Sequence, residues 1–316
     1  MRQITGTVLV TGGTGSFGKT IVRRLLRSQA ELVCVLSRDE TKQAVMREEF
    51  ASSRLKFVTG DVRDLQTVEE AMRGANFVFH AAALKQVPNC EAFPVEAIRT
   101  NTLGSENVRQ AAQRTNPETV VAISTDKACE PINSMGLTKA LMERLMLRQT
   151  NHTTKFVCVR YGNVIGSRGS IVPLYTERIR RGLPLPVTNF EMTRFLLHLG
   201  QAVETAIAAA LEGEHGQIWV RKMPAATVRD LVSAMIPAPD YPIDHIGIRP
   251  GEKMHEILVN QNEMRRATEH DDYFILDDEP KTTSPSRDEY TSFNTERLNV
   301  DDVRRILAQA RDVFDE

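Results

Sequence analysis

The feature with the strongest consequences for the fold is a glycine-rich turn near the start of the chain. It follows a short apolar, β-branched segment at residues 7–10 and precedes a helical pattern at 19–27, and it contains Gly12, Gly15 and Gly18. Glycines at this spacing allow a tight turn, close approach of the backbone to a pyrophosphate, and close packing of helix on strand. Strand, turn and helix in this order predict the first unit of a dinucleotide-binding fold.

Strand and helix patterns continue to alternate through the first half of the chain. Further strands are expected at residues 32–36, 55–58, 76–80, 119–124 and 155–160, with helices at 40–50, 65–72, 94–114 and 135–149. This alternation predicts an α/β fold of the Rossmann type, in which helices cover both faces of a doubly wound parallel sheet and the crossovers are right-handed.

Beyond Tyr161 the alternation fails, because Gly and Pro interrupt the chain repeatedly; one helix at 200–211 and one strand at 218–220 are expected there. We divide the chain into an NADP-binding Rossmann domain at 1–163, a smaller, mainly substrate-binding lobe at 164–276 that in part extends the sheet, and a C-terminal tail at 277–316. The tail begins with a polar, Pro-containing connection at 277–287 that is expected to be mobile. It ends in an amphipathic helix at 300–314, which docks on the body or on a neighbouring subunit.

Charge and composition exclude several classes of protein. Lys and Arg number 40 against 41 Asp and Glu, a formal net charge of −1, which argues against nucleic acid or an anionic membrane surface as the main partner. No apolar run approaches the ~20 residues of a membrane span, and the N-terminus enters a strand pattern without a signal-peptide core. The four cysteines form no CxxC pair, and two of them lie in apolar strand-like segments, which predicts buried free thiols. A cytoplasmic location is therefore expected.

The glycine-rich turn and the end of the second strand form the first part of the predicted cofactor site. The turn contributes Gly12, Thr14, Gly15, Ser16, Phe17 and Gly18. The residue that reads the cofactor ribose belongs at the end of the second strand, about twenty residues further on, where Ser37 and Arg38 come first and Lys42 follows a turn later. Cations suit a 2′-phosphate, so NADP is favoured; if Arg38 and Lys42 are simply solvated, NAD is the alternative.

Two later strand ends are also expected to meet the cofactor. Asp61 and Val62 end the third strand and are placed to meet the adenine. Ala81, Ala82 and Ala83 follow the fourth strand, and their small side chains allow a cofactor to lie against the backbone.

Polar residues with catalytic potential end the fifth strand. Thr125, Asp126 and Lys127 follow directly after it, at the carboxyl edge where doubly wound sheets bind their ligands. Met135 and Lys139 come next, one helical turn apart on one face of a helix.

These residues resemble the extended short-chain dehydrogenase/reductases. Within that family the chain is similar to the polysaccharide-biosynthesis UDP-N-acetylglucosamine 4,6-dehydratases, and most to the branch that inverts carbon 5. The matching stretches cover nearly the whole chain: residues 11–18, 37–42, 80–88, 101–104, 124–139, 160–173, 192–195, 249–258 and 290–298. The resemblance implies an NADP-dependent lyase of nucleotide-sugar, polysaccharide or glycoconjugate biosynthesis, with a UDP-sugar as substrate and a homo-oligomeric assembly.

Met135 departs from the usual pattern of the superfamily, which carries a catalytic Tyr four residues before the Lys. A thioether can neither accept nor donate the proton of a substrate hydroxyl. The inverting branch is similar in having Met there and in keeping the Asp–Lys pair matched by Asp126 and Lys127. We therefore predict an active enzyme. A non-enzymatic, NADP-binding sensor is the alternative, and it rests on Met135 alone.

The resemblance implies a mechanism in which the cofactor takes hydride from carbon 4 of the hexose and returns it to carbon 6. Lys139 binds the nicotinamide ribose, and Thr125 completes the predicted catalytic set. Lys127, if desolvated and neutral, removes the proton on carbon 5, while Asp126 as a protonated acid helps the 6-hydroxyl leave. Both inversion and retention at carbon 5 are open from these residues. A UDP-sugar 4-epimerase shares the fold and the first oxidation, so it is the alternative enzyme.

The same resemblance assigns further residues to the ligands. Asn101 joins the cofactor residues, and Lys85 is placed near both nicotinamide and substrate. The predicted substrate residues are Lys85, Asn163, Ser167, Ser170, Val172, Arg194, Arg249 and Glu252. Arginine suits a diphosphate because its planar fork bonds two oxygens at once. No metal site is predicted, because Glu252 and His255 are joined by no second pair at helical spacing.

Overall fold

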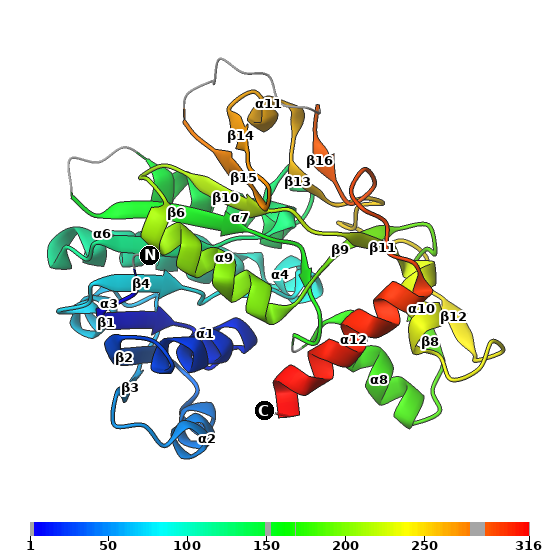
Figure 1. The fold of residues 1–316 in the computed structure, drawn as a ribbon, viewed down its shortest axis with the longest axis horizontal. Coiled ribbons are helices and arrows are strands. Elements are labelled where there is room, and N and C mark those ends of the chain that lie inside the picture. Colours follow the sequence, from blue (N-terminus) through cyan, green and yellow to red (C-terminus); the bar gives the residue numbers. More distant parts are fainter. Residues whose placement is uncertain (1–2, 149–152, 168, 279–287, 316) are drawn as a thin grey trace.

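The computed structural model describes residues 3–148, 153–167, 169–278 and 288–315. Its centre is a nine-stranded sheet with the strand order β14-β15-β10-β6-β5-β4-β1-β2-β3 (Figure 1). The parallel strands are β1 (Gly6–Thr11), β2 (Ala30–Ser37), β3 (Leu55–Thr59), β4 (Phe77–His80), β5 (Thr119–Ile123), β6 (Lys155–Arg160) and β10 (Ile218–Arg221). The predicted Rossmann-type parallel sheet is confirmed.

Helices cover both faces of this sheet. The first face carries α1 (Ser16–Leu26) and α9 (Leu199–Glu212), and the other carries α3 (Leu65–Met72), α6 (Gly104–Thr115) and α7 (Ser134–Leu147) (Figure 1). Every residue of β4 and β5 is buried, as expected for parallel strands that helices cover on both sides. The strand order reverses around β1, which lies between β2 and β4, so a ligand crevice is expected at the carboxyl ends of these strands.

Local signals set the helix ends correctly where side chains cap them. α2 (Glu40–Phe50) begins after Asp39, whose carboxylate accepts from the backbone N–H of Lys42, and it ends at Ala51 in the left-handed conformation. Asp64 caps α3 in the same way, through the N–H of Gln66. The bounds predicted for these two helices are confirmed, since the capping residues are adjacent in sequence to the elements they end.

The helix predicted at 94–114 is one continuous run in the sequence pattern but three elements in the structure. α5 (Pro94–Ala97) leads into a π-helical turn, η1 (Ile98–Leu103), and then into α6. Inside the π turn, the buried amide of Asn101 accepts from the N–H of Leu84 at 2.7 Å and donates to its carbonyl at 2.9 Å. It also donates to Thr138 Oγ1 at 3.0 Å. Asn101 thus holds the loop that follows β4 against α7.

The second half of the chain forms a lobe beside the sheet and also returns to the sheet. The lobe contains β7 (Asn163–Val164), β8 (Leu185–Val187), β9 (Thr193–Leu197), β11 (Ala225–Thr227), β12 (Ile243–His245), β13 (Ile257–Val259), β16 (Tyr290–Thr291), α8 (Ile171–Arg180) and α10 (Val228–Met235). Strand β10 and the antiparallel pair β15 (Tyr273–Leu276) and β14 (Ala267–Glu269) extend the sheet. The sequence prediction missed α8, α10 and the short α4 (Val87–Ala92), which begin among Gly and Pro residues.

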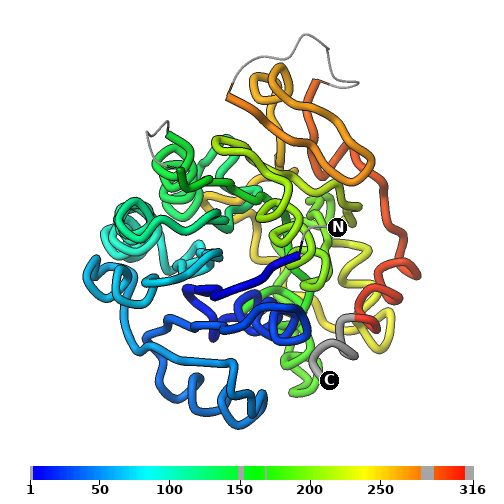
Figure 2. The backbone as a smooth tube through the Cα atoms, turned by 60° about the vertical axis from the view of Figure 1, so that its left-hand side comes forward, coloured from blue at the N-terminus to red at the C-terminus, as the bar shows by residue number. Residues whose placement is uncertain are grey.

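The last helix, α12 (Val300–Asp315), lies along α10 (Figures 1 and 2). Leu298 and Val303 are buried in an apolar cluster with Leu231 of α10, so the prediction that this helix docks on the body is confirmed. Residues 279–287 of the predicted polar connection lie outside the described residues. The prediction of free thiols is confirmed, because all four cysteines are buried and unpaired. In the described part of the chain, no helix is long and apolar enough to cross a membrane.

Candidate active site

The glycine-rich turn packs against the chain that follows β4. Gly12 has a φ of 66°, and a Cβ at this position would lie 2.7 Å from the Cα of Ala82. A Cβ on Gly18 would lie 2.4 Å from the Cα of Gly13. The N-cap of α1 is Gly15, which has no side chain to cap the first turn. The turn therefore fits a dinucleotide pyrophosphate, which can approach the backbone closely and bind at this helix N-terminus.

The remaining predicted residues of the turn connect it to α1 and to the end of β2. The hydroxyls of Thr14 and Ser37 form a hydrogen bond of 2.7 Å, which joins the turn to the end of β2. Ser16 is the first residue of α1. The ring of Phe17 stacks on that of Tyr161, with centroids 6.3 Å apart, and so connects α1 with the end of β6.

Two carboxylates accompany the cations predicted to read the ribose. Arg38 donates to Asp61 at 3.2 Å, so the structure brings together the residues predicted for the ribose and for the adenine. Lys42 pairs with Asp39, whose carboxylate also caps α2. The side chains of Arg38 and Lys42 are 53% and 49% exposed, which leaves both cations accessible to a ligand at this edge. Val62 is buried below them.

The loop after β4 connects the two halves of the molecule. Ala81 and Ala82 are half-buried against the main core, and Ala83 is exposed. Lys85 Nζ donates to Ser167 Oγ at 3.4 Å. The loop thus brings a predicted cofactor and substrate residue to the segment that enters the lobe.

Lys139 and Met135 share a helix but have different surroundings. Lys139 is buried, and its Nζ donates to the carbonyl of Ile123 and contacts the sulfur of Met142. Burial lowers the pKa of Lys139 to about 8. Met135 is buried in a small apolar cluster that includes Cys90, so this position offers packing and no proton-transfer group.

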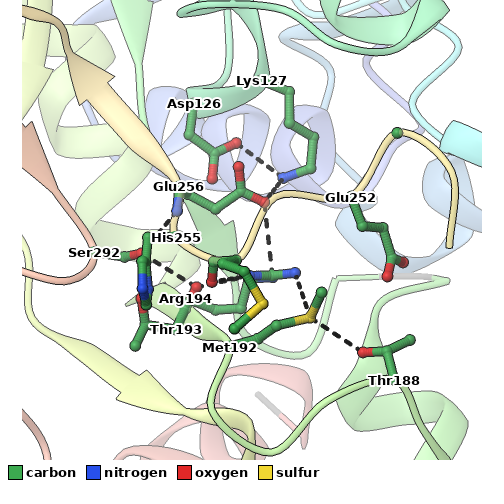
Figure 3. A network of polar contacts seen from close by, with 12 residues as sticks. Asp126, Lys127, Thr188, Met192, Thr193, Arg194, Glu252, His255, Glu256 and Ser292 are labelled. Carbon is green, nitrogen blue, oxygen red and sulfur yellow. Dashed lines mark hydrogen bonds and ion pairs between the residues drawn. The ribbon is translucent and has the colours of Figure 1, made fainter. Parts of the chain in front are cut away.

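Lys127, just after β5, pairs with two buried carboxylates (Figure 3). Its Nζ is 3.0 Å from Asp126 Oδ1 and 3.2 Å from Glu256 Oε1. The Asp126 and Glu256 side chains are only 1% and 4% exposed, whereas that of Lys127 is 22% exposed. Thr125 Oγ1 donates to Asp126 Oδ1 at 2.8 Å, and Arg194 Nε lies 3.7 Å from Glu256 Oε1. We call Asp126, Lys127, Arg194 and Glu256 the Lys127 cluster.

The resting charge of Lys127 differs from the one that the predicted mechanism requires. Burial disfavours its ammonium form, but attraction by Asp126 and then by Glu256 outweighs burial and repulsion by Arg194, so the pKa of Lys127 is raised. Lys127 is therefore charged at neutral pH, so the condition attached to its predicted role as a base, a neutral amine, is not met at rest. It can act as a base only after it passes its proton to a neighbour.

The remaining predicted cations come from β9, which carries Arg194, and from the segment before β13, which carries Arg249. Arg194 donates to the carbonyls of Thr193 and Met254 at 2.8 and 3.3 Å, and its side chain is largely buried. Arg249 is about half exposed and lies 3.8 Å from Glu252. Figure 3 shows Glu252 beside the Lys127 cluster, on the chain that continues to Glu256.

Several buried polar atoms at this end of the sheet have no hydrogen-bond partner among the described residues. They are Asp126 Oδ2, Glu256 Oε2, Asn163 Oδ1, Ser170 Oγ and Glu252 Oε2. Burying such atoms unpaired costs free energy, so they mark positions where hydroxyl or amide groups of a ligand can bind. Val172 differs from the other predicted substrate residues, because it packs against the apolar cluster that contains Ile165 and Leu231.

Comparison with known proteins agrees with this geometry. The family described as "Polysaccharide biosynthesis protein" matches residues 8–278. The chain belongs to this family of extended short-chain dehydrogenase/reductases. The UDP-glucose 4-epimerase of Rickettsia rickettsii (strain Sheila Smith) is 43% identical over 323 aligned positions, which cover 95% of each chain.

Solved structures place this family member among proteins of the same fold. The X-ray structure of Pen from Bacillus thuringiensis is 35% identical, with a TM-score of 0.91 and coverage of 96% of this chain and 97% of that one. The UDP-glucose 4-epimerase of Thermus thermophilus, solved in complex with NAD, is 27% identical with a TM-score of 0.68. That alignment covers 78% of this chain and 88% of the other.

Sequence reasoning missed one residue of the Lys127 cluster. Glu256 was not among the predicted residues, although it lies within the matching stretch 249–258. The sequence did contain a signal, because the matching stretch holds two acidic residues, Glu252 and Glu256, on either side of His255. Their spacing could not show which of them pairs with Lys127, because only the folded chain brings Glu256 to that lysine.

Proposed function

We propose that the protein is a UDP-N-acetylglucosamine 4,6-dehydratase that inverts carbon 5. The observation that carries this proposal is the Lys127 cluster. Epimerisation at carbon 4 needs proton transfer at the 4-hydroxyl alone, whereas elimination also needs a base at carbon 5 and an acid at the 6-hydroxyl. Asp126 and Lys127, with Glu256 beside them, supply several proton-transfer groups within hydrogen-bond distance of one another.

The geometry of the turn supports a nicotinamide dinucleotide as cofactor, and we propose NADP. The turn at Gly12 and the N-terminus of α1 would hold the pyrophosphate, and Lys139 the nicotinamide ribose. Arg38 and Lys42 are accessible at the end of β2, where a 2′-phosphate would lie. The bound cofactor supplies reversible hydride transfer, accepting hydride from carbon 4 and returning it to carbon 6.

Residues of the chain divide the proton transfers between them. Lys127 takes the proton from carbon 5, which the ketone at carbon 4 has made acidic. Asp126, whose Oδ2 is buried and has no partner among the described residues, gives a proton to the departing 6-hydroxyl. Arg194 and Arg249 would bind the diphosphate and the uridine ribose, Asn163 would contact the sugar or a phosphate, and Ser167 and Ser170 would line the path of the uridine pyrophosphate.

A UDP-sugar 4-epimerase is the second candidate. It is favoured by the name of the Rickettsia rickettsii relative, a UDP-glucose 4-epimerase that is 43% identical over 95% of each chain. The two reactions share the first oxidation at carbon 4. They differ afterwards, because an epimerase releases no 4-keto-6-deoxy sugar and leaves the hydrogen on carbon 5 in place.

Incubation of the purified protein with its cofactor in heavy water, followed by NMR, separates these functions. UDP-N-acetylglucosamine and UDP-glucose are supplied in parallel reactions. We expect a 4-keto-6-deoxy product from the first, with deuterium at carbon 5 and coupling constants of the inverted sugar. Inversion at carbon 4 alone, from either substrate, would establish the epimerase. Cofactor binding without affinity for either substrate would instead favour the sensor.

We further propose a homo-oligomer in the cytoplasm. Exposed apolar side chains on α5, η1 and α7 and next to them support a subunit interface: Phe93, Val95, Ile98, Leu103, Leu137 and Leu141. Four buried free thiols are consistent with a reducing compartment. Light scattering coupled to size-exclusion chromatography measures the assembly, and a monomer at micromolar concentration would contradict it.

A further inference from the structure

Glu256 is held in place by two segments that are distant from it in sequence. Its backbone N–H donates to Ser292 Oγ at 2.8 Å, and the N–H of Ser292 donates to the Glu256 carbonyl at 2.8 Å. Ser292 Oγ lies 2.7 Å from Thr193 Oγ1 at the edge of β9. Thr193 also bonds His255 Nδ1 at 2.8 Å. These bonds fix the backbone of Glu256, so its carboxylate reaches Lys127 from a rigid position (Figure 3).

The charged groups around Glu256 balance one another. Lys127 and Arg194 face its carboxylate, and Asp126 also pairs with Lys127. A proton that moves from Lys127 to Glu256 converts a buried ion pair into a neutral pair without changing the net charge of the Lys127 cluster. In a desolvated site, such a transfer avoids the cost of creating an isolated charge.

Glu256 also has the capacity to hold this proton. Its Oε1 accepts from Lys127 at 3.2 Å, while its Oε2 is buried without a partner among the described residues. Lys127 must lose a proton before it can act as a base, because its flanking carboxylates raise its pKa. The two carboxylates lie within 3.2 Å of one Nζ, so protons can pass between them through Lys127.

We propose that Glu256 acts through Lys127, as the group that holds the lysine's proton while Lys127 deprotonates carbon 5. This inference rests on the proposed dehydratase function and adds to it a residue that works behind the base. Glu256 is thus a positioning and proton-storing residue, and Lys127 remains the group that touches the substrate.

The protons balance over the elimination. Lys127 passes a proton to Glu256, and the neutral amine takes the proton from carbon 5, whose C–H electron pair moves into the 4-ketone to form an enolate. Lys127 passes that second proton to Asp126, which gives it to the 6-hydroxyl as the C6–O bond breaks, water leaves, and the enolate electrons form the bond between carbons 5 and 6. Glu256 then returns its proton to Lys127, which restores the starting charges of the Lys127 cluster.

The test compares Glu256→Gln and Glu256→Asp with the wild-type enzyme. Each is loaded with cofactor and given UDP-N-acetylglucosamine in heavy water. Reduced-nicotinamide absorbance reports the first oxidation, and NMR reports deuterium at carbon 5. Glu191→Gln is the control, because Glu191 also pairs with an arginine but is exposed. We expect Glu256→Gln to retain the first oxidation within about threefold and to lose about 100-fold in carbon-5 exchange.

The pH profile separates proton storage from a structural role. Removing the charge of Glu256 lowers the pKa of Lys127, so a lysine that worked alone would exchange carbon 5 faster at neutral pH. If Glu256 stores the proton, then in Glu256→Gln the proton of Lys127 must leave to solvent. The residual carbon-5 exchange of that variant should therefore rise about tenfold per pH unit, while the wild-type profile stays flat. Glu256→Asp should restore part of the rate together with the flat profile.

Three results would overturn the inference: wild-type exchange in Glu256→Gln, a flat profile in that variant, or equal loss of both steps in the two Glu256 variants. The proposed function fails separately. If the wild-type enzyme forms no 4-keto-6-deoxy sugar and incorporates no deuterium, the dehydratase is wrong before any variant is compared.

Discussion

The glycine-rich turn between β1 and α1 and the Lys127 cluster are assembled in opposite ways. The turn consists of neighbouring residues between β1 and α1, and its glycines pack on backbone atoms nearby. The Lys127 cluster takes residues from the end of β5, from β9 and from the segment before β13, and Ser292 of the C-terminal tail holds Glu256 in place. As a contiguous site, the turn depends on few other segments, chiefly the loop after β4 against which Gly12 packs, whereas the Lys127 cluster, a dispersed site, depends on every segment that meets there.

The largest expected effect is at the centre of the dispersed site. Lys127→Ala removes the group that takes the carbon-5 proton, so deuterium exchange at carbon 5 should fall by about 1,000-fold or more. Affinity for the cofactor, measured by fluorescence titration, should stay within about threefold. Lys222→Ala breaks the ion pair with Glu269 and is the matched control. Normal exchange in Lys127→Ala would exclude Lys127 as the base.

A substitution in the contiguous site should have the reverse pattern. Gly12→Ala places a Cβ 2.7 Å from backbone atoms of Ala82 at a φ of 66°, so the turn must shift. We expect about 100-fold weaker cofactor binding and a loss of about 2–3 kcal/mol in the free energy of unfolding.

Gly74→Ala separates conformational strain from the steric clash. Gly74 also has a positive φ, of 74°, but nothing lies within 4 Å of its Cβ position. This variant should lose about 1 kcal/mol of stability and keep its cofactor affinity. Equal effects of the two glycine substitutions on cofactor binding would contradict close packing at the turn.

The next effect tests how far the dispersed site depends on its supports. Arg160 binds Glu143 at 2.6–2.8 Å and Glu263 at 2.8 Å in the interior, and it also donates to the carbonyl of Leu258. Glu263→Gln weakens this network, so we expect a loss of about 2 kcal/mol in thermal or denaturant unfolding.

The same variant should slow carbon-5 exchange by about tenfold, because Leu258 lies two residues beyond Glu256. Glu177→Gln, which affects an exposed ion pair on α8, is the control and should change neither quantity measurably. If Glu263→Gln lowers stability while the exchange rate is unchanged, the Lys127 cluster does not depend on this network.

The smallest effect concerns the choice of cofactor. Arg38→Ala should weaken NADP binding by about tenfold and leave NAD binding nearly unchanged, because only the 2′-phosphate requires the cation. Arg63→Ala is a matched control, since Arg63 pairs with the same Asp61 carboxylate at 2.7 Å. Calorimetric titration with both cofactors measures the difference. Equal loss for NADP and NAD would oppose the proposed preference for NADP.

Much of the first half of the fold could be predicted because its signals are local. The bounds of α2 and α3 follow from capping residues and apolar spacing, and β4 and β5 are short apolar runs buried on both faces. The second half has strands of only two to five residues, such as β7 (Asn163–Val164). A strand that short has too few residues to show a period of two, so its pattern cannot be distinguished from a turn.

By itself, the sequence determined the parallel sheet, the glycine-rich turn and the position of Asp126 and Lys127 just after β5, because each depends on residues that are near one another in the chain. Only the tertiary structure decided the π turn that carries Asn101, the charged state of Lys127 and the place of Glu256. The charge of Lys127 depends on burial and on two carboxylates, one of them far away in sequence. Contacts between distant segments form when the chain packs, so spacing along the sequence does not reveal them.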